Sequence, residues 1–316
     1  MREIFLQALQ SSCKGHLKPN ESLRNHTTLK VGGLADIWFE PVDESELIHA
    51  LRLAKEFEQK VYVLGGGSNS LIPDEGLKGL LIHLSPKYFG QIELNDQGHV
   101  CAGAGLPLGS LLKFLVNHGF GDCEFMMGIP AQVGGALAMN AGSASHWIGD
   151  YLIKGRYVTF EGEAKFFDKE EAQFRYRDSG LRGKVVTYAE FNFPIKDAEV
   201  TKKKLSEYNA YRMRTQDLKH PNCGCMFANP TGTKSAGQLI DEAGLKGYRI
   251  GDAQVSQIHG NFMINVGHAR HRDVVALLEH IEHVVYEKYQ IQLRREFRLF
   301  DEGEPHSRLK EVDHES

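Results

Sequence analysis

The sequence has few cysteines and no long apolar run. Its cysteines are odd in number and sparse, which argues against a disulfide framework and suits a reducing compartment. The first ten residues, MREIFLQALQ, predict a short amphipathic helix rather than a signal peptide, and no segment is apolar enough to span a membrane. We therefore expect a cytoplasmic protein without a membrane partner. The five cysteines are Cys13, Cys101, Cys123, Cys223 and Cys225.

The sequence also lacks a strong excess of either charge. Charged residues make up 25% of the chain, the net charge is −4, and no basic run occurs, so nucleic acid is not expected as a partner. With 316 residues, 41% of them hydrophobic, the chain is long enough for two or three domains with cores of their own. These values are typical of an ordinary soluble enzyme.

Glycine, in contrast, is abundant, with 33 residues, and much of it lies in two blocks. GGGSN (65–69) directly follows a predicted strand, so its successive backbone N–H groups can form an anion-binding nest for a diphosphate. A tight connection between strands is the alternative. The Walker pattern fails because no Lys-Ser/Thr follows, and the dinucleotide pattern G-x-G-x-x-G fails because position 70 is Ser70. The second block, GIPAQVGGALAMNAGSA (128–144), offers a surface of small residues on which a flat ligand could lie.

Hydrophobic periodicity predicts mixed helices and strands without internal repeats. A helix over 45–58 is expected to be capped by Ser45, and a charged helix over 202–213 is expected to connect two domains. Residues from 301 onwards are polar and lack aromatic side chains, which predicts a disordered tail. The other expected helices are 107–118, 236–243 and 272–289, and the expected strands are 61–64, 80–84, 99–102, 157–160, 164–167, 185–193, 261–266 and 291–300.

Seven segments, in this order, resemble UDP-N-acetylenolpyruvoylglucosamine reductase, the MurB family. The resemblance extends from about residue 20 to residue 300, and seven ordered motifs make it specific. The segments are NHTTLKVGGLADIWFEP (25–41), LGGGSNSLIPDEGLKGLLIHL (64–84), GIPAQVGGALAMNAG (128–142), FRYRDSG (174–180), GCMFANP (224–230), AGQLIDEAGLKGYRIGDAQVSQIHGNFMINVG (236–267) and IQLRREFRLF (291–300).

The resemblance implies an α+β fold: an FAD-binding domain of the vanillyl-alcohol-oxidase (PCMH) type in two lobes, and a carboxy-terminal α+β substrate domain. The implied boundaries are 1–86 for the first lobe, 87–200 for the second, 201–298 for the substrate domain and 301–316 for the tail, with 291–300 returning to the first lobe. The implied activity is the NADPH-dependent reduction, through non-covalent FAD, of UDP-N-acetylglucosamine enolpyruvate to UDP-N-acetylmuramate for peptidoglycan. A monomer is expected.

The same resemblance implies which residues hold the cofactor. The FAD diphosphate would lie on the first glycine block and the flavin on the second. Ala131 stands where the family has a further glycine, a small change that should be tolerated. The implied cofactor-binding residues are Gly65, Gly66, Gly67, Ser68, Asn69, Gly128, Ile129, Val133 and Gly134.

Reduction of the enolpyruvyl group places negative charge next to its carboxylate, so the site needs a cation and then an acid. Arg177 matches the family's arginine in FRYRDSG and would bind the carboxylate through its planar donor fork. On a strand Arg175 would share its face, so spacing alone does not choose between the two. Glu296 matches the second acid of a terminal Glu-x-Glu motif, and Arg294 replaces the first. Either Arg177 or Glu296 could instead be a solvated surface charge.

Cys225 stands where the family has a serine proton donor. A thiol with an ordinary pKa of about 8.5 is protonated at neutral pH and is an easier donor than an alcohol. A buried structural thiol is the alternative. No metal site is expected, because no second ligand cluster accompanies Cys223, Cys225 and His220, and a disulfide between residues two apart would be strained. Cys223 is expected to be a bystander.

Further matching positions fall in the substrate domain. Asn229 would contact the UDP part of the substrate, and Gln216, His259 and Asn261 lie in matching segments without a defined role. Ala228 replaces a lysine of the family, so one cationic contact is missing or supplied elsewhere. The interval between Arg177 and Cys225 is too short for the tyrosine-bearing loop of one branch, which implies the shorter, more open type.

The residues alone are also compatible with two other functions. The glycine blocks alone would also suit a flavin oxidase or dehydrogenase acting on a small hydroxy acid or sugar, but such an enzyme has no reason to share GCMFANP, HGNF and RREF. A non-catalytic nucleotide-sugar-binding protein is the other alternative. Retention of Arg177, Glu296 and an acid at Cys225 argues against it.

Overall fold

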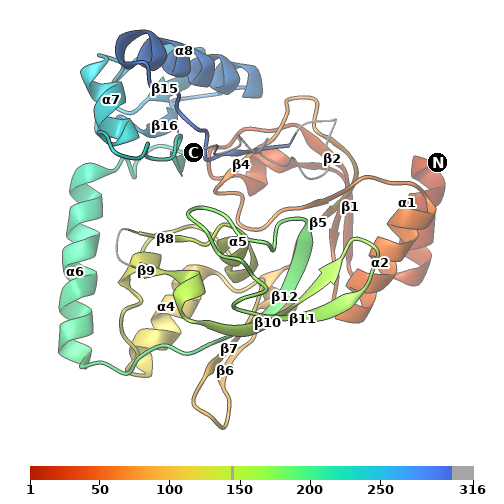
Figure 1. Ribbon diagram of the computed structural model, residues 1–316. Coiled ribbons are helices and arrows are strands. Elements are labelled where there is room, and N and C mark those ends of the chain that lie inside the picture. The colour runs from red at the N-terminus through yellow and green to blue at the C-terminus, as the bar shows by residue number, and fades with distance from the viewer. Residues whose placement is uncertain (144–145, 301–316) are drawn as a thin grey trace, which may run out of the picture.

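The computed structural model describes residues 1–143 and 146–300, and the predicted polar tail lies outside these residues. Within them, three main β-sheets follow one another along the chain, each accompanied by helices (Figure 1). This mixed architecture confirms the predicted α+β fold. Over the same residues, none of the helices combines the length and the apolar character needed to cross a bilayer.

The first sheet has the strand order β1-β2-β5-β3. β2 and β3 run parallel to β5, and β1 runs antiparallel to β2. The helix α2 begins before the predicted cap Ser45, because the carboxylate of Asp43 accepts the N–H of Glu46 and so caps the helix instead. The elements are α1 (Arg2–Ser12), β1 (His16–Ser22), β2 (Leu34–Glu40), α2 (Glu44–Glu56), β3 (Val61–Val63), β4 (Ser70–Leu71) and β5 (Leu77–Ile82).

The second sheet is antiparallel, in the order β11-β10-β12-β7-β6. The second glycine block, expected to be rich in turns, also contains the short helix α5. The elements are α3 (Pro86–Phe89), β6 (Ile92–Leu94), β7 (Val100–Gly103), α4 (Leu108–Asn117), α5 (Val133–Ala138), β8 (Gly142–Ser143), β9 (His146–Trp147), β10 (Leu152–Thr159), β11 (Ala164–Asp168) and β12 (Lys184–Phe191).

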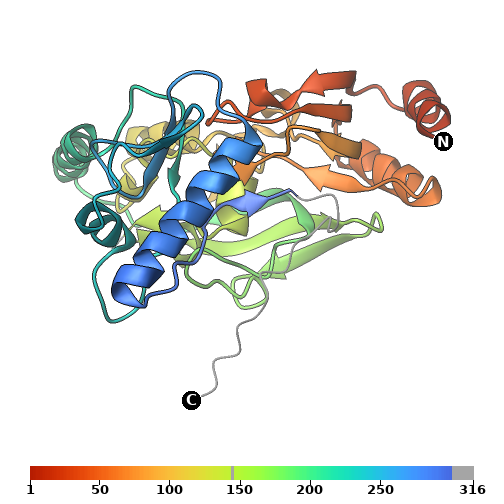
Figure 2. The ribbon, with the colours of Figure 1, turned by 90° about the horizontal axis from the view of Figure 1, so that it is seen from above.

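The third sheet is antiparallel, in the order β13-β16-β15-β14, and α8 packs on β14 and β15 (Figure 2). The apolar side chains of α8 recur every three or four residues, so one face of the helix is buried. The elements are α6 (Ala198–Thr215), β13 (Asn222–Cys225), α7 (Ala236–Glu242), β14 (Arg249–Ile250), β15 (Ala253–Val255), β16 (Phe262–Asn265), α8 (His271–Tyr289) and β17 (Arg298–Leu299).

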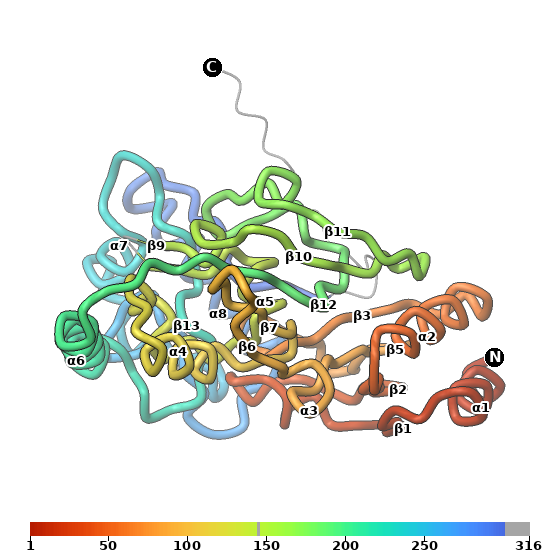
Figure 3. Tube along the Cα trace, turned by 90° about the horizontal axis from the view of Figure 1, so that it is seen from below, coloured from red at the N-terminus to blue at the C-terminus, as the bar shows by residue number. Residues whose placement is uncertain are grey.

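One apolar core joins the first two sheets, which lie side by side (Figure 3). Leu51 of α2 and Phe191 of β12 belong to this same buried cluster. A separate cluster lies between α8 and the third sheet, with Val255 and Leu277 among its members. We call the three sheets with their helices the first, second and third parts of the molecule. The long helix α6 bridges the second and third parts at the edge of the molecule (Figure 1). Its buried residue is Thr201.

The predicted strand over 291–300 is wrong for most of its length. Only β17 is a strand, and it pairs in parallel with β4 of the first part. Arg295, earlier in the segment, forms an isolated antiparallel bridge with Phe227 of the third part. Because the segment pairs first with one part and then with another, it cannot follow one continuous ladder.

Asp74 also links the first and third parts. Its two carboxylate oxygens accept the backbone N–H groups of His271 (2.9 Å) and Arg272 (3.4 Å), at the start of α8. These N–H groups have no partner within the helix, and the carboxylate also complements the positive end of the helix dipole.

We predict that Asp74→Ala lowers the free energy of unfolding by about 1 kcal/mol, the usual value for a lost helix cap. Urea denaturation would measure the loss. Asp96→Ala, at an exposed turn residue, is the control and should change little. An unchanged midpoint for Asp74→Ala would show that this contact between the two parts does not stabilise the fold.

Candidate active site

The first glycine block is packed against the second one. A Cβ on Gly66 would lie 2.6 Å from the carbonyl oxygen of Pro130, and a Cβ on Gly67 would overlap the carbonyl oxygen of His26. Gly67 also has a φ of +62°, in the left-handed region that favours glycine. The close approach of these backbones therefore requires glycine at both positions.

A cleft opens between the two glycine blocks. Its apolar wall comes from strands of both sheets, and three cations (Arg182, Lys184 and Arg298) line it as well. Burial, and next the neighbouring Arg182, lower the pKa of Arg298. A flat apolar ring system with a diphosphate fits this lining, which combines apolar side chains, glycine backbone and positive charge. The remaining lining residues are Val63, Leu64, Gly65, Leu84, Ala104, Gln132, Gly134, Gly135, Ala138, Leu181, Gly183 and Val186.

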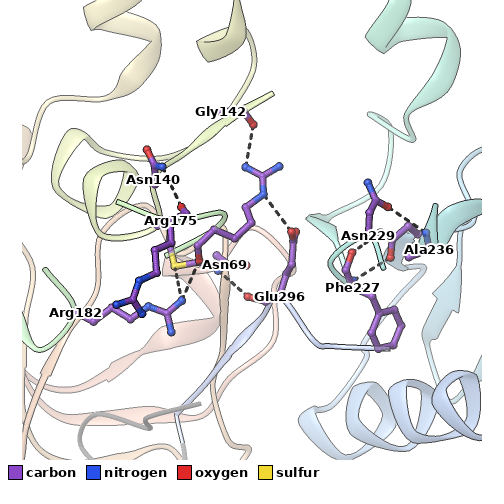
Figure 4. Close-up of polar contacts among 12 residues, drawn as sticks. Asn69, Asn140, Gly142, Arg175, Arg182, Phe227, Asn229, Ala236 and Glu296 are labelled. Carbon is purple, nitrogen blue, oxygen red and sulfur yellow. Dashed lines mark hydrogen bonds and ion pairs between the residues drawn. The ribbon is translucent and has the colours of Figure 1, made fainter. Parts of the chain in front are cut away.

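The predicted cofactor residues occupy different places around this cleft. Gly65 and Gly134 line it, and Val133 is fully buried in the core behind it. Ile129 is partly buried against the same core, whereas Gly128 faces the Arg212 guanidinium of α6. Ser68 is half-buried. The Asn69 side chain donates to the backbone oxygen of Glu296 (3.0 Å), so it ties the glycine block to the carboxy-terminal segment (Figure 4).

We predict that Gly67→Ala abolishes FAD retention, because the added methyl group would displace the backbone of His26 and with it the loop. The measure is the ratio of flavin absorbance to protein absorbance after purification. Gly98→Ala is the matched control: Gly98 has a similar φ of +77° but open space around it, so the variant should bear backbone strain of about 1 to 2 kcal/mol and retain FAD. Full flavin content in Gly67→Ala would contradict the assignment of the cradle.

Arg177 lies in a tight turn, so the case of a strand, in which Arg175 and Arg177 would share a face, does not apply. The turn is closed by a bridge between Arg175 and Asp178, and Arg177 has a left-handed φ of +57°. Asn140 supports the turn by donating to the carbonyl oxygen of Arg175 (3.0 Å; Figure 4). Because the chain turns here, Arg175 and Arg177 do not share a face: Arg175 is exposed and Arg177 is half-buried.

The guanidinium of Arg177 is held from several sides. Its Nε donates to Oε1 of Glu296 (3.1 Å) and its Nη1 donates to the carbonyl oxygen of Gly142 (2.9 Å). The two acceptor residues, Glu296 and Gly142, are labelled in Figure 4. The rings of Trp147 and Tyr176 lie 5.3 and 5.6 Å from its Cζ, within cation–π range. Among the described residues, Nη2 has no hydrogen-bond partner, so it can bind an anionic ligand.

Glu296 is not a solvated charge. Its side chain is 11% exposed, and burial raises the pKa of its carboxyl group, an effect that the Arg177 guanidinium opposes. Its backbone N–H donates to the carbonyl oxygen of Met226 (2.8 Å), and the N–H of Ala228 donates to the carbonyl oxygen of Arg294 (2.9 Å). These two bonds attach the Glu296 segment to the segment that follows Cys225.

Cys225 ends strand β13 and belongs to the same cluster of charges. Burial, and then the Glu296 carboxylate, raise the pKa of its thiol to about 12, and Arg177 opposes the rise. Cys223 is buried, and burial raises the pKa of its thiol as well. In the part of the chain that the structure describes, no group of three or more His, Cys, Asp or Glu side chains could hold a metal ion. The structure thus brings Arg177, Glu296 and Cys225 together from three distant segments.

The four residues predicted for the substrate all contact backbone or side chains of the protein. Oδ1 of Asn229 accepts the N–H of Ala236 at the start of α7 (3.1 Å), as Figure 4 shows. Oε1 of Gln216 accepts from Nε of Arg212 (2.8 Å), and Nδ1 of His259 accepts the N–H of Asn261 (3.1 Å). The Asn261 amide binds the backbone of the segment after Cys225.

Sequence reasoning missed several residues that border the site. Arg212 donates to the backbone oxygen of Met127 beside the second glycine block, and burial lowers its pKa. Arg182 donates to the backbone oxygen of Arg177 (3.1 Å). Lysines and arginines are common on helices and strands, so nothing local distinguished these side chains, and only the fold shows which of them point into the cleft.

We predict slow alkylation of Cys225 by iodoacetamide in the folded protein. At pH 9, a pKa of about 12 leaves about one thiol in a thousand ionised, whereas an ordinary cysteine is mostly ionised. The measurement is mass spectrometry of the peptide that contains Cys225, against the same protein in denaturant. Glu296→Gln removes a charge that raises this pKa and should speed the reaction. Modification of the folded protein as fast as the denatured one would contradict the raised pKa.

Comparison with known proteins covers almost the whole chain. Residues 216–300 match the family "UDP-N-acetylenolpyruvoylglucosamine reductase, C-terminal domain", and residues 35–166 match an FAD binding domain. UDP-N-acetylenolpyruvoylglucosamine reductase of Halalkalibacterium halodurans is 39% identical over 302 residues, 95% of this chain and 99% of that protein. The Bacillus subtilis reductase is 35% identical over 300 residues, 94% and 98% of the two chains. The crystal structure of the Thermus caldophilus reductase superposes with a TM-score of 0.78 at 34% identity, covering 91% of this chain and 99% of that one.

Proposed function

Because this chain belongs to the UDP-N-acetylenolpyruvoylglucosamine reductase (MurB) family, it is a flavin-dependent oxidoreductase of peptidoglycan synthesis, and we propose that Arg177, Cys225 and Glu296 perform its chemistry. It reduces UDP-N-acetylglucosamine enolpyruvate to UDP-N-acetylmuramate. Bound FAD supplies the hydride transfer from NADPH to the enolpyruvyl group. The match over residues 216–300 sets aside both the flavin oxidase and the non-catalytic protein.

A cation, a carboxylate and a thiol meet next to Arg182, a residue of the cleft that donates to the backbone oxygen of Arg177, and this meeting carries the residue assignment. Arg177 and Glu296 form an ion pair of 3.1 Å, and both act electrostatically on the Cys225 thiol. Nowhere in the sequence are the three adjacent, so their meeting depends on the fold.

Arg177 would bind the substrate carboxylate. With Nε on Glu296 and Nη1 on Gly142, the guanidinium plane is oriented before the substrate arrives, and Nη2 is left for the ligand. Negative charge that develops next to the carboxylate is stabilised best by donors that need no rearrangement, with about 3 kcal/mol at stake per donor. Trp147 and Tyr176 would shield the cation from water and so strengthen that interaction.

Cys225 would donate the proton that completes the reduction. The raised pKa of about 12 makes the thiol a weaker acid than a free cysteine, and therefore closer to the serine of the family than the sequence suggested. It also keeps the thiol protonated throughout the neutral range. Hydride addition leaves a basic carbanion on the carbon atom next to the carboxylate, so a weak but fully protonated donor is suitable.

Glu296 would orient Arg177 and keep the thiol protonated, rather than donate a proton itself. Its carboxylate accepts from Nε of Arg177, and its charge is one of the causes of the raised thiol pKa. Arg294, at the family's first acidic position, is exposed, so Glu296 is the carboxylate that this segment supplies to the site.

The cofactor and domain assignments are proposals of the same kind. Gly65, Gly66 and Gly67 would hold the FAD diphosphate, with Gly134 beside the flavin, which the glycine contacts and the cleft lining support. The domain division would be 1–86, 87–200 and 201–298. The net charge of −4 supports the absence of nucleic-acid binding, the sparse cysteines support a cytoplasmic location, and a site built within one chain supports a monomer.

We predict that Cys225→Ala lowers kcat about a hundredfold to ten-thousandfold, the usual contribution of a positioned acid, while NADPH still bleaches the flavin. Cys225→Ser should keep much of the activity because the hydroxyl can donate the same proton. Stopped-flow absorbance of the flavin separates its reduction by NADPH from its reoxidation by the enolpyruvyl substrate.

Cys223→Ala is the matched control, because Cys223 lies on the same strand and is buried. In this variant the enolpyruvyl substrate should reoxidise the reduced flavin at the wild-type rate. Normal turnover by Cys225→Ala would show that the Cys225 thiol is structural and that another group donates the proton.

A further inference from the structure

The segment 226–228, which follows Cys225, has its backbone groups bonded on two opposite edges. On one edge, the N–H of Met226 donates to the backbone oxygen of Asn261 (2.8 Å). On the other, Met226 accepts from Glu296 (2.8 Å) and Ala228 donates to Arg294 (2.9 Å). The segment therefore lies between Asn261 on one edge and the segment 294–296 on the other, like the middle strand of three. Its position sets the distance between Cys225 and Glu296.

The regular ladder between β13 and β16 does not extend over this segment. The register pairs Cys225 with Phe262, after an irregularity between Asn222 and Cys225, where Gly224 has a φ of +76°. Beyond Cys225, the neighbouring chain turns away, because Phe262 donates back to the carbonyl oxygen of His259 (3.0 Å). Among residues 1–143 and 146–300, Phe227 therefore has no backbone partner on this edge.

The side chain of Asn261 takes the place of the missing backbone. Its Oδ1 accepts the N–H of Phe227 (3.0 Å) and its Nδ2 donates to the carbonyl oxygen of Phe227 (2.7 Å). Asn261 is 3% exposed and Phe227 is 1% exposed, so water cannot replace either bond. A side-chain amide carries one acceptor and one donor group like a peptide unit, which is why asparagine can satisfy both groups at once.

We propose that Asn261 is a positioning residue that fixes the segment 226–228 and thereby holds the Cys225 thiol in register with Glu296. This inference rests on the proposed catalytic roles of Cys225 and Glu296. Asn261 acts through the backbone of Phe227 and does not contact the substrate, because both ends of its amide are already engaged.

His259 in turn holds the backbone of Asn261 in place. Its Nδ1 accepts the N–H of Asn261 (3.1 Å), which requires the unprotonated nitrogen, and burial lowers the pKa of its imidazole. The groups around it are the ring of Phe262, 4.6 Å from the imidazole, and the charge of Lys246, which lowers the pKa further. The neutral ring therefore keeps Asn261 in place at neutral pH.

The experiment compares Asn261→Ala with Asn265→Ala in the full-length FAD-loaded enzyme. Asn265 lies on β16 and is also 3% exposed, and its amide donates to Leu29 and accepts from Gly267 and Ala269. In the described part of the chain its amide bonds neither 226–228 nor 294–296, so it controls for the loss of a buried amide. Thermal unfolding would confirm that both variants are folded at the assay temperature.

In Asn261→Ala, we expect reoxidation of NADPH-reduced flavin by the enolpyruvyl substrate to slow by about tenfold to a hundredfold, the effect of misplacing a catalytic group by about 1 Å. Reduction by NADPH should stay within about twofold of wild type, because the thiol has no part in that step. Hydrogen exchange of the Phe227 and Glu296 amides should accelerate in this variant and not in Asn265→Ala.

Equal slowing of reoxidation in the two variants, or unchanged exchange of the Glu296 amide in Asn261→Ala, would overturn the proposal. The exchange measurement does not depend on the acid role of Cys225. If Cys225→Ala turned over normally while Asn261→Ala released Glu296, the proposed acid role of Cys225 would fail and the structural part of this inference would hold.

Discussion

The ion pair between Arg177 and Glu296 is the contact on which the site depends. It joins a turn of the second sheet's domain to the carboxy-terminal segment, over 3.1 Å, with side chains that are 27% and 11% exposed. A partly buried charge without a partner is costly, so each of the two residues stabilises the other in place. The same pair contributes to the charge around Cys225, and through the backbone bonds of the 294–296 segment it is connected to the segment 226–228.

This arrangement meets two opposing requirements, binding of an anionic carboxylate and protonation of the Cys225 thiol. A cation is needed for the carboxylate of the substrate, but a cation alone next to a thiol would lower its pKa and favour the thiolate. Burial and the carboxylate of Glu296 outweigh Arg177 at Cys225, so the pKa of the thiol rises instead. In the proposed mechanism, one site can therefore hold a positive group for the substrate carboxylate and a protonated donor for the carbon atom.

Local sequence signals were sufficient for most of the fold and for the glycine blocks, because propensity, caps and left-handed glycines act within a few residues. They failed where a distant partner decides the conformation. Nothing within the FRYRDSG segment predicted its conformation, because a bond from Asn140 and the bridge from Arg175 to Asp178 close it into a turn. The cations Arg182, Lys184 and Arg298 have no local pattern, so their place at the cleft could not be predicted.

The sequence by itself determined the family and the two glycine blocks and named Arg177, Cys225 and Glu296 as candidates, because each of these is written in a short motif of fixed spacing. Only the tertiary structure decided how those three residues interact. The pKa values of Cys225 and Glu296, the orientation of the guanidinium and the proposed role of Asn261 depend on burial and on distances between segments far apart in the chain. Desolvation and Coulomb energy are properties of that packing and have no counterpart in a linear motif.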